Sequence, residues 1–160
     1  PTILTKDTII AEIDEAVRKL NDDEILIAGR VLYINSDLQQ LLNNAFARSW
    51  GSKSVVSTML TRYNAIPIKY VPPTRFYSEI ELNDGTTDWG YKKSENGKNI
   101  NFMLIYPEAI LQVVKLTLPK VFTPDENQEK DMWKFQFRIY HDAFVYENKA
   151  KGIYLHTATN

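Results

Sequence analysis

The apolar residues of this chain follow two different periods, and these limit what it can fold into. In residues 6–20 they recur every three or four positions, which is the spacing of one helix face. In residues 133–140 they alternate with polar residues, which is the spacing of a strand with one buried face. We therefore expect helices and strands in the same chain, with a helix near its start and a half-buried strand near its end.

The predicted helix of residues 6–20 has one apolar and one charged face. Thr5 is placed to cap its first turn, and Ile13 lies in the middle of the apolar face. Asp14 and Arg18 form an acid–base pair four residues apart on the other face. Exposed pairs contribute little, so we expect removal of Asp14 to change stability by less than about 1 kcal/mol. We interpret these carboxylates as a solvated face and not as a catalytic pair.

Turn residues and prolines divide the middle of the chain into short segments. Ser36 followed by Gln39 has the form of a capping box and predicts the start of a second helix. The Asn83-Asp84-Gly85 sequence predicts a hairpin turn. The expected order is a strand at 31–34, a helix from 36 that ends at 43–44, an irregular connection at 46–61, a strand at 66–71, and an antiparallel meander with strands at 76–82, 86–93 and 100–106. The strand at 133–140 is expected to turn at 147–149 into a last strand at 152–156.

Composition excludes several classes of function. Nineteen basic against twenty acidic residues give a net charge of −1, which argues against a dedicated nucleic-acid binder. The chain has no cysteine, so disulfides, thiolate metal sites and cysteine nucleophiles are excluded. His141 and His156 lack a nearby nucleophile motif, and we interpret them as structural or solvent-facing. No nucleotide, hydrolase or metalloprotease motif occurs, so we predict no catalytic residue, no metal site and no cofactor.

Four blocks of the sequence follow one another in a characteristic order. They are residues 29–34, 61–68, 102–115 and 133–154, of which the last is the strongest. In these blocks the chain resembles the major capsid proteins of tailed phages and prophages of Gram-positive bacteria, over nearly its whole length. No block carries chemistry, so the resemblance rests on order and spacing.

The resemblance implies an α+β chain with the tailed-phage major capsid fold. It identifies residues 1–24 as the spine-helix segment of the peripheral domain, 25–130 as the axial domain and 131–160 as closing strands of the peripheral domain. Family members are longer and carry an N-terminal arm and an extended loop before the position of Pro1. We therefore expect a fragment or trimmed form that stays monomeric or forms small oligomers and builds no closed shells.

The implied function is that of a structural subunit, not an enzyme, which associates with copies of itself in capsomers to enclose DNA. The resemblance places it in the virion capsid, and in the host cytoplasm during assembly. Portal and scaffolding proteins are further candidate partners, contact with packaged DNA is expected to be weak and non-specific, and no membrane is involved.

Two interpretations of the aromatic residues remain open. Phe46, Arg48 and Trp50 combine the residue types enriched at interface hot spots and are our candidates for self-association. Alternatively, Phe46 and Trp50 fill the core of the domain itself.

Other functions compete with the capsid hypothesis. A β-rich carbohydrate- or ligand-binding module on a virion or cell surface would use Trp89, Tyr91 and Trp133. A hydrolase with dispersed carboxylates is a third alternative, since such pairs leave no short motif.

Overall fold

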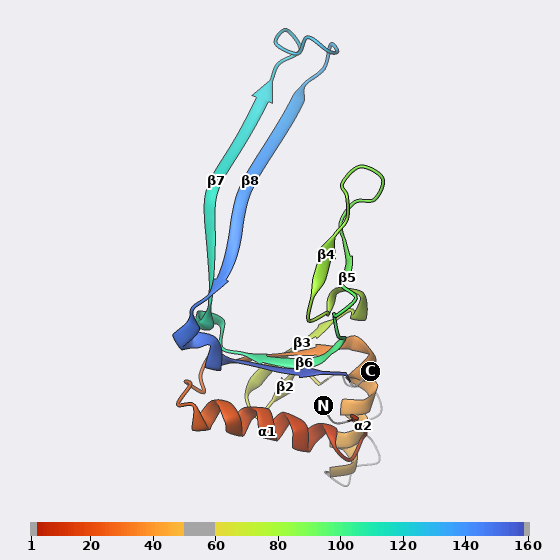
Figure 1. Cartoon of the computed structure of the whole chain (residues 1–160), viewed down its shortest axis with the longest axis vertical. Helices are drawn as coiled ribbons and strands as arrows, with labels where there is room; N and C mark the ends of the chain where they lie inside the picture. The colour runs from red at the N-terminus through yellow and green to blue at the C-terminus, as the bar shows by residue number, and fades with distance from the viewer. Residues whose placement is uncertain (1–2, 50–59, 159–160) are drawn as a thin grey trace. The chain divides into compact units, whose positions relative to one another are not determined.

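The computed structural model describes residues 3–49 and 60–158 and divides the chain into two units (Figure 1). The first, which we call the sheet unit, consists of residues 1–109 and 150–160, and the second, the ribbon unit, of residues 110–149. The boundaries of these two units, at residues 109/110 and 149/150, differ from those of the segments expected at 1–24, 25–130 and 131–160. The assignment of segments to capsid domains stays a prediction.

The sheet unit contains a five-stranded mixed sheet (Figure 1). Its strands are β1 (Val31–Asn35), β2 (Arg62–Tyr63), β3 (Ile66–Val71), β6 (Ile100–Ile105) and β9 (Ile153–Thr157), in the order β2-β3-β1-β6-β9. β1 and β3 are parallel, and the other neighbours are antiparallel. The predicted strands at 31–34 and 66–71 are confirmed.

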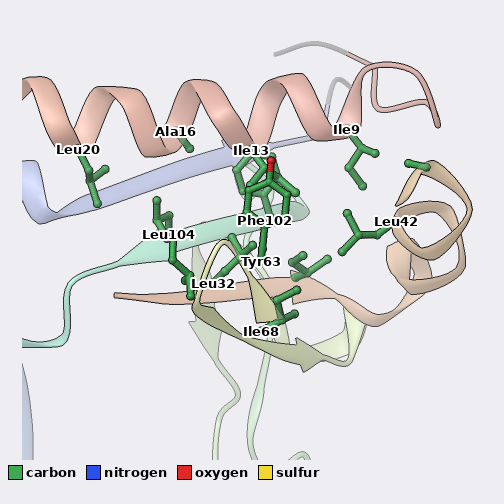
Figure 2. Close-up of a cluster of buried hydrophobic side chains, with 13 residues drawn as sticks. Ile9, Ile13, Ala16, Leu20, Leu32, Leu42, Tyr63, Ile68, Phe102 and Leu104 are labelled. Carbon is green, nitrogen blue, oxygen red and sulfur yellow. The ribbon is translucent and has the colours of Figure 1, made fainter. Parts of the chain in front are cut away.

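Helices α1 (Ile9–Asp22) and α2 (Gln39–Ser49) contribute to one hydrophobic core with this sheet (Figure 2). From α1 the core takes Ile9, Ile13, Ala16 and Leu20, which are at most 1% exposed, so the predicted apolar face is confirmed. The helix begins later than expected, because Thr8 and not Thr5 is its N-cap.

The predicted pairing of Asp14 with Arg18 is wrong. The Arg18 guanidinium instead pairs with Glu15, three residues earlier on α1. The Asp14 carboxylate accepts a hydrogen bond from the hydroxyl of Tyr63 on β2, whose side chain is 3% exposed. Only the tertiary fold brings β2 beside α1, so helical spacing could not indicate this contact.

The second helix also differs from the expected one in its start and its end. The Asn35 side chain, and not Ser36, caps a 3₁₀ turn over Ser36–Leu38 that leads into α2. α2 continues past Asn43, because Leu42 and Ala45 are buried in the core and extend its apolar face. Asn43 uses its side-chain oxygen to accept the N–H of Leu60 and does not end the helix.

The predicted meander is confirmed only in the pairing of its first two strands, and both are shorter than the expected 76–82 and 86–93. β4 (Ile80–Leu82) pairs with β5 (Tyr91–Lys93), but β6 lies between β1 and β9 in the main sheet. The reason is burial, because Phe102 and Leu104 on one face of β6 belong to the core that the sheet shares with α1 and α2. Short 3₁₀ helices occur at Pro73–Arg75, Pro107–Ala109 and Glu147–Gly152.

The ribbon unit is a long two-stranded antiparallel hairpin, which we call the ribbon. It consists of β7 (Ile110–Phe122) and β8 (Lys134–Val145), with a bulge between Val114 and Leu116 (Figure 1). Two expectations are corrected here. Nearly all residues of both strands are exposed, so β8 is not half-buried, and β9 pairs with β6 instead of returning beside β8.

A buried arginine fixes the loop that follows α1. Arg30 is 1% exposed, and its guanidinium donates hydrogen bonds to the backbone carbonyls of Leu26, at 2.9 Å, and Ile25. A longer contact of 3.4 Å reaches the carbonyl of Val17 within α1. Burial lowers the pKa of Arg30 from its ordinary value. These carbonyls therefore anchor the loop to the entry of β1.

Candidate association surfaces

The two histidines lie in different units. His141 is exposed on β8, and His156 is buried on β9. Within residues 3–49 and 60–158, no three histidine or acidic side chains gather as a metal site. No helix in the same residues is long and apolar enough to span a membrane.

His156 has a core position between α1 and the sheet. Its ring stacks on Phe102 at 4.9 Å, and Asn101 Nδ2 lies 3.2 Å from its Nδ1. Its Nε2 is 3.6 Å from the Glu12 carboxylate of α1, beyond hydrogen-bond reach. Burial lowers the pKa of His156, and the nearby Glu12 charge opposes that shift. This geometry suits a structural residue that responds to acid.

The candidate self-association residues at the end of α2 are described only in part. Phe46 is half-buried, packs against the core and meets Tyr63 edge to face, with ring centroids 5.4 Å apart. That contact favours the core-filling interpretation for Phe46. Arg48 lies within α2, and Trp50 lies outside the described residues, so their part in self-association stays a prediction.

The most unusual surface of the described chain is the ribbon itself. Large apolar side chains on both of its strands are exposed, and the extremes are Phe135 at 74% and Phe137 at 68%. An isolated two-stranded hairpin is at best marginally stable in water. Exposed apolar patches that are large and contiguous mark surfaces that bind another molecule. The ribbon is therefore a candidate association surface.

The outer half of the ribbon has two unlike faces. One face carries the apolar series Phe135, Phe137 and Ile139, opposite Val121, Pro119 and Thr117. The other carries Lys134, Gln136 and Arg138, opposite Phe122, Lys120 and Leu118. A hollow of about 410 Å³ lies here, lined by Leu118, Lys120, Gln136, Phe137 and Arg138. This half of the ribbon can present an apolar face to one neighbour and a cationic face to another.

The β4–β5 hairpin is a second exposed surface. Its turn is held by Asp84, whose carboxylate accepts N–H groups of Thr86, Thr87 and Asp88 at 3.0 Å each. These bonds lower the pKa of Asp84 from its ordinary value, and the bond from Asp88 is the largest cause. The braced turn precedes Trp89, which is 80% exposed. The turn therefore presents an exposed aromatic ring on which a flat partner could stack.

The residues of the alternative binding module do not share one unit. Trp89 precedes β5 and Tyr91 begins it, both in the sheet unit, whereas Trp133 precedes β8 in the ribbon unit. All three side chains are exposed.

Sequence reasoning missed the full exposure of the ribbon. The apolar pairs at adjacent positions of β7, such as Val113 and Val114, gave no sign of this exposure. Adjacent residues of a strand point to opposite faces, so two adjacent apolar residues are typical of a strand that is covered on both faces.

Comparison with known proteins gives a likeness of fold only. No family model matches the sequence, and no curated protein matches it. A solved chain from Mycobacterium phage Che8 is similar, with a TM-score of 0.61 at 12% sequence identity. The match covers 97% of this chain and 50% of that chain, so this chain spans half the length of the solved chain it matches.

Proposed function

We propose that this chain is a structural subunit of a phage capsid shell that acts by association with copies of itself to enclose DNA. The observation that carries the proposal is the exposed apolar ribbon, since such a surface is stabilised when another polypeptide segment or another chain covers it. The shared fold with a phage chain and the order of the sequence blocks support it. The proposal requires no reaction, cofactor or metal, and its partners are other copies and other virion proteins.

The test is self-association of the purified chain, measured by light scattering across a concentration series. We expect small oligomers that grow with concentration. Replacing Phe135 and Phe137 together by Ser should weaken this association, because both side chains lie on the apolar face of the ribbon. Leu82→Ser is the matched control, since Leu82 is 77% exposed but lies on β4. The sequence alone allowed a monomer, but the exposed apolar ribbon predicts association, so a wild-type chain that stays monomeric at every concentration would contradict the proposal.

A second candidate function is a ligand-binding module centred on Trp89. It is favoured by the exposure of this indole beside the turn that Asp84 holds. Titration with soluble glycans, followed by tryptophan fluorescence, separates the two functions when wild type is compared with Trp89→Ala. Quenching that Trp89→Ala abolishes, in a chain that remains monomeric, would favour the binding module.

A further inference from the structure

The two outer edges of the ribbon differ in their capacity to accept another strand. β7 carries Pro119, which has no N–H to donate, and its ladder is interrupted by the bulge beside Lys115. β8 runs over Lys134–Val145 without proline, glycine or bulge. An uninterrupted exposed edge is a template for strand addition. The edge of β8 is therefore the open one.

Two charges on β8 lie symmetrically about its centre. Arg138 and Asp142 are each two residues from Tyr140 and share its face of the ribbon. Across the hairpin Arg138 faces Leu118 and Asp142 faces Val113, so β7 supplies neither with an opposite charge. Among the described residues neither forms an ion pair, although Asp142 accepts the N–H of Ala143 at 2.8 Å. Both are exposed.

This symmetry favours one register for two β8 strands that pair antiparallel. When Tyr140 lies opposite Tyr140, Arg138 of each copy lies opposite Asp142 of the other. Opposite charges directly across a sheet are stabilising, and like charges are destabilising. A register centred on Gln136 would place Lys134 opposite Arg138, and one centred on Arg138 would place this residue opposite itself.

The same register also matches the apolar face. Phe137 falls opposite Ala143 of the other copy, and Phe135 falls opposite Val145. Aromatic side chains that meet aliphatic ones across strands add to sheet stability. Charge and apolar pairing therefore agree on a twofold contact in which each copy uses the same edge.

We infer that β8 pairs edge to edge with β8 of a second copy, antiparallel and centred on Tyr140, to form a four-stranded β7-β8-β8-β7 sheet. The inference rests on the proposed function, because it specifies one contact by which copies associate. It identifies the partner as this chain and the decisive pair as Arg138 with Asp142.

Cysteine cross-linking tests the register without background, because the chain has no cysteine of its own. Opposite residues of antiparallel strands have Cα atoms about 4.5–5.5 Å apart, within the range that a disulfide spans. Tyr140→Cys should therefore form a disulfide-linked dimer under mild oxidation. Gln136→Cys is the control on the same strand and face, because its symmetry mate would be about 27 Å away. Failure of the Tyr140→Cys variant to cross-link, or equal cross-linking of both variants, overturns the register.

Charge exchange supplies an independent measurement. Arg138→Asp or Asp142→Arg alone places like charges opposite each other twice and should weaken dimerisation about tenfold or more. The double variant R138D/D142R restores both pairs and should recover the wild-type dissociation constant. The inference is overturned if the two single variants and the double variant all dimerise with the wild-type dissociation constant. It is also overturned if the double variant dimerises no more tightly than the single variants.

These outcomes separate the inference from the proposed function. Copies that associate through the apolar face, with no cross-link in the Tyr140→Cys variant and no effect of charge exchange, refute the β8 contact and leave the structural role standing. A wild-type chain that never associates refutes both.

Discussion

The contact between Asp14 and Tyr63 predicts a stability effect that the helix pattern alone would not. Tyr63 is 3% exposed and its hydroxyl donates to the Asp14 carboxylate. Asp14→Ala leaves this buried hydroxyl without its acceptor, which costs about 1–3 kcal/mol. Tyr63→Phe removes the donor and leaves a carboxylate that water can solvate, so it should cost only about 0.5–1.5 kcal/mol. When Asp14→Ala is added to the Tyr63→Phe variant, it should cost almost nothing more.

The assay is urea unfolding of the two single variants and the double variant, monitored by circular dichroism. Glu15→Ala is the matched control, because Glu15 is the next exposed carboxylate on α1 and pairs only at the surface with Arg18. Its expected cost is about 0.5 kcal/mol or less. The reasoning is refuted if Asp14→Ala costs no more than Glu15→Ala, or if the effects of the two single substitutions are additive. Burial, together with the bond to and the charge of Asp14, raises the pKa of Tyr63 and keeps its phenol protonated.

Three further predictions concern the core of the sheet unit. Ile13→Asp places an unpaired charge at a position that is 0% exposed and should cost about 4 kcal/mol or more, so an unchanged melting temperature would contradict the packing. Arg30→Met removes hydrogen bonds to backbone carbonyls and should cost about 2 kcal/mol or more in urea unfolding, whereas Arg18→Met should cost about 0.5 kcal/mol or less. Burial depresses the pKa of His156 in the folded state, so the unfolded state binds more protons in acid. Stability should be full above pH 6.5 and fall as the pH drops below it, and His156→Phe should reduce this slope in urea unfolding repeated across that range.

Local pattern was sufficient where one element decides the outcome. The spacing of Ile9, Ile13, Ala16 and Leu20 predicted the buried face of α1, because helical geometry places residues three and four apart on one side. The Asn-Asp-Gly turn predicted that β4 pairs with the next strand, but the connection runs over residues 83–90, so the return strand begins at Tyr91 and not at Thr86. Element boundaries were less well predicted, since α2 extends to Ser49 to bury residues that only the sheet makes a core.

Pairing between distant segments could not be predicted from the same signals. Alternation shows that residues 133–140 form a strand but not what covers its faces, so the exposure of Phe135 and Phe137 was missed. The partners of β6 and β9 lie far apart in sequence, and nothing local distinguishes them from adjacent strands of a meander. The ribbon was missed as a candidate association surface for the same reason. The sequence of an apolar strand does not show whether the strand lies in a core or on a surface.

The sequence by itself determined the approximate position of the first helix and its apolar face, the strands at 31–34 and 66–71, and the absence of cysteine chemistry. These follow from local geometry and composition, which need no knowledge of neighbours. Only the tertiary structure decided that Tyr63 binds Asp14, that Arg30 is buried, and that the large apolar side chains of the ribbon are exposed. Tyr63 and Asp14 are 49 positions apart in the sequence, and the burial of Arg30 and the exposure of the ribbon depend on what the fold places around them.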